Sequence, residues 1–203
     1  MKNAASTASQ TVYIVSGFMR TGTSMMMRAL EAGGMQACYR QSREDMRKRY
    51  ADEHYDPNFG GLYELERKDY QKWDFPRGYE GKLIKALSLG VPQMDVMPDG
   101  IRVVFMRRHP EEIRQSYLAF FNRDLRGTER LDERMEHIIA RIENRRDVLS
   151  MDVLWYREVV ERPLECFERL RDRGWPIDVK AAVATVNPEL CRYKLERLTI
   201  GVL

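Results

Sequence analysis

Residues 12–24, VYIVSGFMRTGTS, decide the fold of this chain. The first part, Val12–Ser16, is apolar and rich in β-branched residues, which predicts a strand buried on both faces. A helix is predicted from Thr23, because the good helix formers MMMRALEA follow and Gly33–Gly34 stop them. The turn between them, Gly17–Gly22, directs backbone N–H groups and the helix N-terminus toward one point. This arrangement is typical of a cradle for a phosphate-like anion.

The rest of the chain continues to alternate strands with helices. Three further strands are predicted at residues 82–87, 102–106 and 153–156. Further helices are predicted from Pro110, after a cap at Thr128, from Pro163 to about 173, and from near Ile177. Such alternation builds a parallel sheet through right-handed crossovers. We therefore expect a single-domain, three-layer α/β/α sandwich around a central parallel sheet.

Two segments depart from this alternation. Residues 1–10 are small and polar and are expected to form a flexible leader, with the α/β domain filling residues 11–203. Residues 39–80 are charged, weakly periodic, and hold 9 of the chain's 20 aromatic residues. A structureless segment of that length is uncommon in a compact domain, so short helices are expected there. We expect this segment to form a cap beside the site, although its aromatic residues serve equally well as ordinary packing.

The composition excludes several classes of protein. Hydrophobic residues make up 43% of the 203 residues, which is enough for a core and too many for a disordered chain. The net charge of +3 is too small for a nucleic-acid surface, and no run of 18 apolar residues predicts a membrane span. Cys38, Cys166 and Cys191 share no close spacing, which predicts neither a disulfide scaffold nor a zinc site. We expect a cytoplasmic protein without a metal and without a nucleic-acid or membrane partner.

Arginine dominates the cations, with 26 arginines against 8 lysines. A guanidinium donates paired hydrogen bonds to anions such as phosphate and sulfate, so the excess of arginine is compatible with anion recognition. Codon bias would produce the same excess. Four arginines are expected to be solvated charges on amphipathic helices: Arg130, Arg134, Arg141 and Arg145.

The turn fits a Walker A frame only in part. Gly17, Gly22 and Ser24 match the pattern, but Thr23 stands where a lysine is required. That lysine serves the β- and γ-phosphates of a nucleoside triphosphate, so ordinary ATP or GTP chemistry is disfavoured. Arg20 supplies a cation from inside the turn instead. A purely structural strand–helix turn is the alternative, but it needs neither this arginine nor three hydroxyls at the helix start.

Residues 16–24 resemble the 5′-phosphosulfate-binding loop of the sulfotransferase superfamily, where a basic residue precedes Ser or Thr, Gly, Thr and then Thr or Ser. Further segments are similar to the bacterial branch of that family: 61–64, 81–85, 103–110 with 116–117, 176–178 and 187–192. The resemblance covers about residues 12–194. It implies a P-loop-like fold and transfer of a sulfuryl group from 3′-phosphoadenosine-5′-phosphosulfate (PAPS) to a hydroxyl or amine.

The resemblance also implies roles for individual residues. Arg20 and the backbone N–H groups of residues 21–24 would stabilise charge on the leaving phosphate. Arg108 would pair with the 3′-phosphate and Ser116 would add a hydroxyl, so Arg20 and Arg108 would lie at opposite ends of the bound bisphosphate. Arg107 is expected to be a neighbouring charge that is either solvated or structural. The expected donor-binding residues are Gly17, Arg20, Thr21, Gly22, Thr23, Ser24, Arg108 and Ser116, with Lys85 and Arg192 as further candidates.

The general base departs from the family pattern. Cytosolic eukaryotic members carry a histidine after the second strand, but the corresponding stretch here reads Lys85-Ala86-Leu87. Glu64 is predicted to take the acceptor's proton, with His54 as the second candidate. The acceptor, whether a small molecule, a glycan or a peptide, is not determined by the sequence. Two alternatives stay open: a P-loop nucleotide kinase or hydrolase, and a non-catalytic nucleotide-binding member of the same fold.

Overall fold

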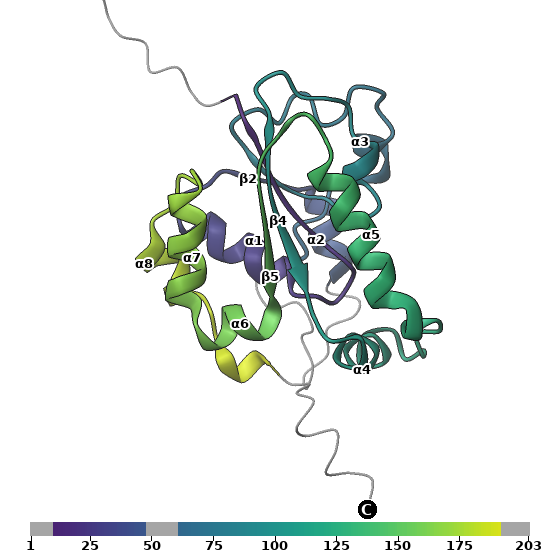
Figure 1. Ribbon diagram of the computed structural model, residues 1–203. Helices are drawn as coiled ribbons and strands as arrows, with labels where there is room; N and C mark the ends of the chain where they lie inside the picture. The colour runs from purple at the N-terminus through teal and green to yellow at the C-terminus, as the bar shows by residue number, and fades with distance from the viewer. Residues whose placement is uncertain (1–9, 48–60, 192–203) are drawn as a thin grey trace, which may run out of the picture.

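A five-stranded, all-parallel sheet forms the centre of the molecule (Figure 1). The computed structural model describes residues 10–47 and 61–191. In the sheet the strands follow the order β2-β3-β1-β4-β5. They are β1 (Val12–Gly17), β2 (Ala37–Cys38), β3 (Leu83–Lys85), β4 (Ile101–Arg107) and β5 (Val148–Trp155). The predicted α/β class with a central parallel sheet is therefore confirmed, whereas residues 1–9 of the predicted leader lie outside the described residues.

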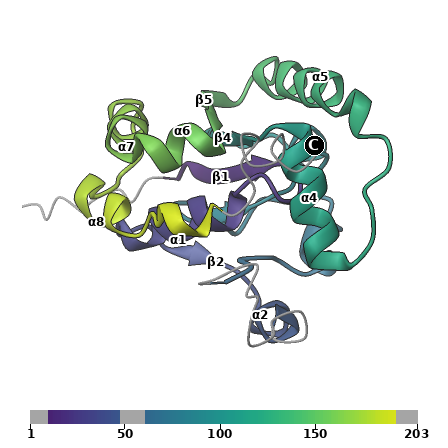
Figure 2. The same cartoon turned by 90° about the horizontal axis from the view of Figure 1, so that it is seen from below.

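Helices cover both faces of this sheet. Figures 1 and 2 show α1, α7 and α8 on one side of the sheet and α5 on the other. The helices are α1 (Thr23–Ala32), α2 (Gln41–Arg47), α3 (Arg67–Tyr70), α4 (Pro110–Phe121), α5 (Leu131–Glu143), α6 (Tyr156–Glu161), α7 (Pro163–Asp172) and α8 (Val179–Ala184), with 3₁₀ turns at Val91–Gln93, Thr128–Arg130 and Pro188–Leu190. Within the described ranges, no helix combines the length and the apolar character that crossing a membrane requires.

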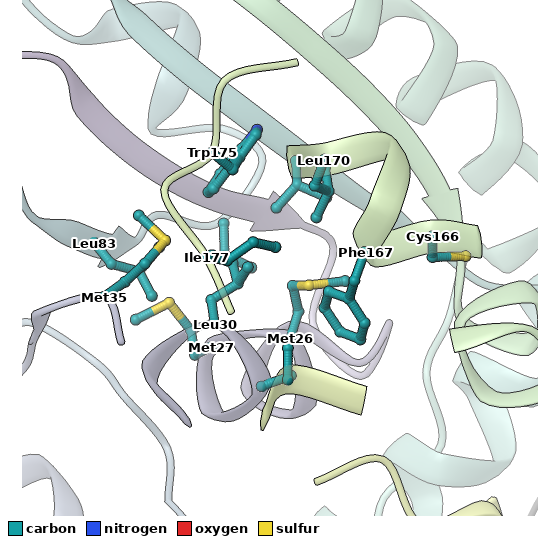
Figure 3. Close-up of a cluster of buried hydrophobic side chains, with 14 of the residues drawn as sticks. Met26, Met27, Leu30, Met35, Leu83, Cys166, Phe167, Leu170, Trp175 and Ile177 are labelled. Atoms are coloured by element: carbon teal, nitrogen blue, oxygen red, sulfur yellow. The ribbon is translucent and has the colours of Figure 1, made fainter. Parts of the chain in front are cut away.

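The central strands divide their side chains between two cores. Along β1, Tyr13 and Val15 join the cluster under α1, α7 and α8, while Val12 and Ile14 join the cluster under α5. This division follows from the two-residue period of a strand, and burial on both faces explains the continuous apolar run. Figure 3 shows the first cluster, in which Trp175 lies among methionine and leucine side chains.

Several predicted boundaries are wrong where pairing, rather than local pattern, sets the element. The last strand begins at Val148, not at 153, because it pairs with β4 from Val148 to Trp155, with one register shift between Ile101 and Arg102. Tyr156 does not end that strand but begins α6. The strand predicted at 82–87 is limited to residues 83–85, and the edge strand β2 was not predicted.

Two helix starts also differ from the prediction. Thr128 does not cap α5 but is the first residue of a 3₁₀ turn, and Gly127, directly before that turn, has a φ of 74°. The last predicted helix starts at Val179, because the Asp178 side chain accepts a hydrogen bond from the Ala181 amide at 3.1 Å. A short polar residue at this N-cap position fixes the start of the helix.

Arg145 is not the solvated charge that the sequence predicted. Its side chain is only 10% exposed and forms an ion pair with Asp147 at 2.7 Å. The same guanidinium donates to three backbone carbonyls in the 91–95 stretch, those of Val91, Met94 and Asp95. Arg145 therefore anchors the segment that leads into β4, a role that helical periodicity does not reveal.

We expect Phe105→Ala to lower the free energy of unfolding by about 3–5 kcal/mol, because the ring is fully buried between β4 and the cover of α5. Chemical denaturation measures the change. Leu164→Ala, at a side chain that is 52% exposed, is the control and should change stability by less than about 0.5 kcal/mol. Equal effects of the two substitutions would contradict the assignment of this core.

Candidate functional site

The loop between β1 and α1, residues 17–22, requires glycine at both ends. Gly17 has a φ of 143° and Gly22 a φ of 96°. A Cβ on Gly17 would lie 2.6 Å from the carbonyl oxygen of Met106, and one on Gly22 would lie 2.4 Å from the ring of Tyr156. Arg20, between them, also has a left-handed φ of 68°. The loop is therefore fixed by its neighbours as well as by its own backbone.

The strand order places cations on both sides of this loop. β1 lies between β3 and β4, and the register sets Lys85 beside Val15 and Met106 beside Gly17. Lys85 ends β3, while Arg108 directly follows β4. The carboxyl ends of parallel strands meet at one edge of the sheet, which is where α/β proteins bind ligands. This edge carries Lys85, Arg20 and Arg108 around the N-terminus of α1.

Arg20 contacts α4. Its Nε donates to the Ser116 Oγ at 3.0 Å, and its guanidinium lies over the Phe120 ring, 4.7 Å from the centroid. The Arg20 carbonyl accepts from Arg108 Nη1 at 3.3 Å. The structure therefore brings Arg20, Arg108 and Ser116 into one connected group. That the two arginines lie at opposite ends of a bound bisphosphate stays a prediction.

Arg108 links the loop to two helices. Its side chain is 7% exposed, and its Nε pairs with Glu112 on α4 at 2.9 Å. Its guanidinium also lies over the ring of Tyr156, the first residue of α6, at 4.4 Å from the centroid. Arg107 instead pairs with Asp132 and Glu136 on α5. Arg108 is thus part of the scaffold of the loop, and a phosphate at this position would share the guanidinium with Glu112.

The loop hydroxyls bond within the chain. Thr21 is fully buried, and its Oγ1 donates to the carbonyl of Phe18 at 2.7 Å. Thr23 is buried at the start of α1. Ser24 donates from its Oγ to the Leu62 carbonyl at 3.3 Å. Thr21 therefore stabilises the loop itself, while Ser24 joins the loop to a segment 38 residues further along the chain.

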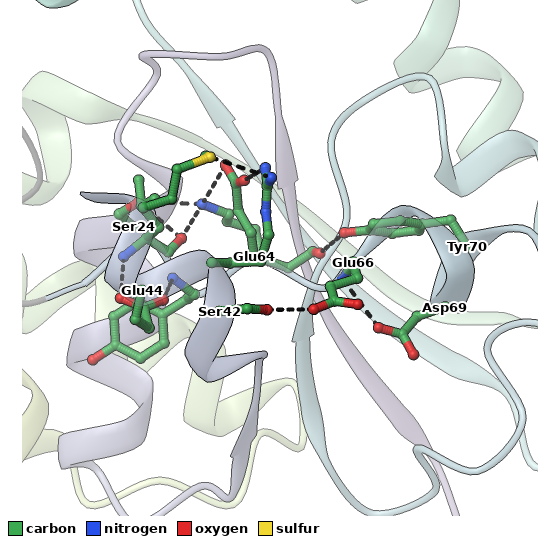
Figure 4. A network of polar contacts seen from close by, with 12 residues as sticks. Ser24, Ser42, Glu44, Glu64, Glu66, Asp69 and Tyr70 are labelled. Carbon is green, nitrogen blue, oxygen red and sulfur yellow. Dashed lines mark hydrogen bonds and ion pairs between the residues drawn. The ribbon is translucent and has the colours of Figure 1, made fainter. Parts of the chain in front are cut away.

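Lys85 connects Ser24 to the predicted base, Glu64. The Lys85 side chain is 4% exposed, and its Nζ lies 3.3 Å from Ser24 Oγ and 3.6 Å from Glu64 Oε1. The Nζ also donates to the Leu62 carbonyl. Burial lowers the pKa of the Lys85 ammonium to about 8, against the opposing effect of Glu64. Glu64 forms its second ion pair with Arg43 of α2, in the polar network of Figure 4.

Sequence reasoning missed three contributors to this site. They are Arg43, Glu44 and the backbone carbonyl of Leu62. The sequence shows the charged residues of α2, but it does not distinguish charges that contact the site from charges exposed to solvent. The short helices expected in residues 39–80 are present as α2 and α3 in the described part of that segment. The predicted candidates His54 and Arg192 lie outside the described residues.

We expect the stability difference between the wild-type chain and Lys85→Met to depend on pH. The lysine pKa is lower in the folded protein than its value of about 10.4 in an unfolded chain, so the unfolded state binds more protons between pH 8 and 10. The wild type should gain about 1–2 kcal/mol relative to the variant from pH 8 to 9.5. Denaturant titrations at each pH test this, and parallel pH profiles would contradict it.

Comparisons with known proteins add little to this geometry. No protein-family model matches the chain, and no curated protein does. Among solved structures, the chain resembles the unliganded crystal structure of a sugar kinase from Janibacter sp. HTCC2649, with a TM-score of 0.40 and 14% sequence identity. The match covers 88% of this chain and 99% of the kinase chain. A likeness at this level assigns neither a family nor an activity.

Proposed function

We propose that this chain is a sulfotransferase that moves a sulfuryl group from PAPS to a hydroxyl or an amine. The supporting observation is the loop between β1 and α1, which has Arg20 within it, Lys85 at the end of one flanking strand and Arg108 directly after the other. Backbone N–H groups at a helix N-terminus and three cations suit a ligand with several anionic oxygens. The resemblance of residues 16–24 to the phosphosulfate loop supports the same assignment.

The strand ends argue against a magnesium-dependent kinase or hydrolase. Such P-loop enzymes hold Mg²⁺ with the loop hydroxyl and an aspartate from a neighbouring strand. Here the loop hydroxyl, Ser24 Oγ, contacts the Lys85 ammonium, and the strand on the other side leads into Arg107 and Arg108. Thr23 also replaces the lysine that serves a nucleoside triphosphate. These positions favour a donor that binds to ammonium and guanidinium groups.

The residues divide the chemical work as follows. The acceptor atom forms a bond to sulfur while the bond from sulfur to the 5′-phosphate oxygen breaks and leaves its electron pair on that oxygen. Arg20 and the first backbone N–H groups of α1 stabilise the new charge. Arg20 acts by charge alone, since a guanidinium keeps its protons. Glu64 accepts the proton of the acceptor, which requires its carboxylate to exchange the ion pair with Lys85.

The donor assignment predicts that adenosine 3′,5′-bisphosphate binds at least tenfold more tightly than AMP. The additional phosphate would gain charge-assisted hydrogen bonds from Arg108 and Ser116, and a bond to a charged group is worth about 1.5–3 kcal/mol. Calorimetric titration with the bisphosphate, with AMP, and with ATP plus magnesium measures the preference. Equal affinities for bisphosphate and AMP would refute the 3′-phosphate site, and a magnesium-dependent preference for ATP would refute the proposed function.

Arg20→Ala should reduce sulfuryl transfer by about 10²–10³-fold, as expected when a group that stabilises the leaving charge is lost. Release of adenosine 3′,5′-bisphosphate from PAPS, with a panel of phenols, alcohols and amines, measures turnover without knowledge of the acceptor. Arg20→Gly should show the same loss, since glycine accepts the left-handed backbone at this position.

Arg130→Ala is the matched control, because Arg130 is an exposed arginine paired with Glu133. It should keep full turnover and an unchanged melting temperature. Retained turnover in both Arg20 variants would show that this arginine is not part of the catalytic site. Turnover absent from the wild type as well, with bisphosphate binding intact, would favour a non-catalytic nucleotide-binding protein.

A further inference from the structure

The donor groups of Ser24 and Lys85 are directed toward acceptors of the chain itself. A serine hydroxyl has one proton to donate, and an ammonium has three. Ser24 donates to the Leu62 carbonyl, and Lys85 is surrounded by that same carbonyl, Ser24 Oγ and Glu64 Oε1. The Leu62 oxygen therefore accepts hydrogen bonds from both donors, Ser24 and Lys85, that a phosphate oxygen at the start of α1 would need.

A strained segment, the 61–64 arch (Gly61–Glu64), carries this carbonyl. Gly61 has a φ of 134° and Tyr63 a φ of 57°, so the backbone bends sharply on both sides of Leu62. The Tyr63 hydroxyl donates to Glu31 of α1 at 2.7 Å, which ties the arch to the helix behind the loop. Leu62 is itself buried, with 5% of its surface exposed.

The Glu44 carboxylate holds the arch from α2. Its two oxygens accept the backbone N–H groups of Leu62 at 2.8 Å and of Tyr63 at 2.5 Å, as drawn in Figure 4. Hydrogen bonds from amides to an ionised carboxylate are about twice as strong as those between neutral groups. Glu44 thus fixes the peptide units on either side of Leu62, the second of which contains the Leu62 carbonyl, and directs that carbonyl toward Lys85 and Ser24.

We propose that Glu44 is a positioning residue that keeps the Leu62 carbonyl in competition with an incoming phosphate or sulfate oxygen for Ser24 and Lys85. The inference rests on the anion site of the proposed function. An anion that binds there displaces the Leu62 oxygen and takes over both donors. Only molecules in which the Leu62 oxygen has left Ser24 and Lys85 are competent to bind the anion. Because the apparent dissociation constant rises as this fraction falls, the arch lowers the affinity of the site for anions.

The exchange also couples anion binding to the predicted base. The Lys85 ammonium is buried, and the loss of an acceptor by a buried charge is costly, so the Leu62 carbonyl leaves as the anion replaces it. Glu64 belongs to the same arch and loses its contact with Lys85 when the arch moves. Glu64 then keeps its ion pair with Arg43 but is separated from Lys85 only after the donor has bound.

Glu44→Gln tests this role against Asp45→Asn, a loss of the same charge at an exposed neighbour on α2 that contacts Gln41. The probes are inorganic pyrophosphate and adenosine 3′,5′-bisphosphate, titrated by calorimetry. Weakening two charge-assisted hydrogen bonds to the arch should make Glu44→Gln bind both probes roughly three- to tenfold more tightly than the wild type. Asp45→Asn should match the wild type.

Hydrogen exchange of the Leu62 and Tyr63 amides is the second measurement, and it needs no variant. Pyrophosphate should accelerate their exchange in the wild-type chain, because the anion displaces the arch. The inference would be overturned if the two amides stayed equally protected with the anion bound. It would also be overturned if Glu44→Gln bound the probes no more tightly than the control, or if neither the wild type nor the variants bound either probe. If the chain binds pyrophosphate but does not prefer the bisphosphate over AMP, the proposed donor PAPS is refuted. The role of Glu44 is then still tested by the pyrophosphate titrations.

Discussion

The chain can pass from β1 into α1 only through two backbone positions that a side chain would block. Gly17 packs against the backbone of β4, and Gly22 packs against the ring of Tyr156. That ring also carries the Arg108 guanidinium, 4.4 Å from its centroid. The loop, the end of β4 and the start of α6 are therefore packed as one unit. The cations near the N-terminus of α1 occupy defined positions because this packing fixes the backbone of the loop at both of its ends.

The charges at this edge of the sheet are balanced within the chain. Arg108 is paired with Glu112, and Lys85 with Glu64. Such pairing offsets the cost of burying cations next to the positive end of a helix dipole. The net charge of +3 therefore does not describe the site, where two buried cations are each paired with a carboxylate of the chain. Under the proposed function, an anion would bind here by replacing those acceptors and not by entering an unpaired positive field.

The parts of the fold that sequence reasoning predicted are those set by local pattern. The continuous apolar runs and the glycine turn located β1, β4 and α1, because burial on both faces and a left-handed backbone leave clear signs in the residues themselves. The first half of β5 has no such run and is a strand because β4 pairs with it. The site shows the same limit: Glu64 was predicted, but its link to Ser24 passes through Lys85 and a backbone carbonyl. No residue type marks a carbonyl as an acceptor, so the Leu62 contact was not predictable.

The internal acceptors also bear on which anion would suit the proposed function. A ligand anion would replace internal acceptors at two places on this edge of the sheet. At Lys85 and Ser24 the internal acceptor is the Leu62 carbonyl. At Arg108 the internal acceptors are Glu112 and the Arg20 carbonyl. A ligand with a single phosphate replaces one of these sets and leaves the other closed. A ligand with two phosphates replaces both sets of acceptors. Selectivity for a bisphosphate would then arise from the acceptors that the chain supplies to itself, in addition to the number of cations.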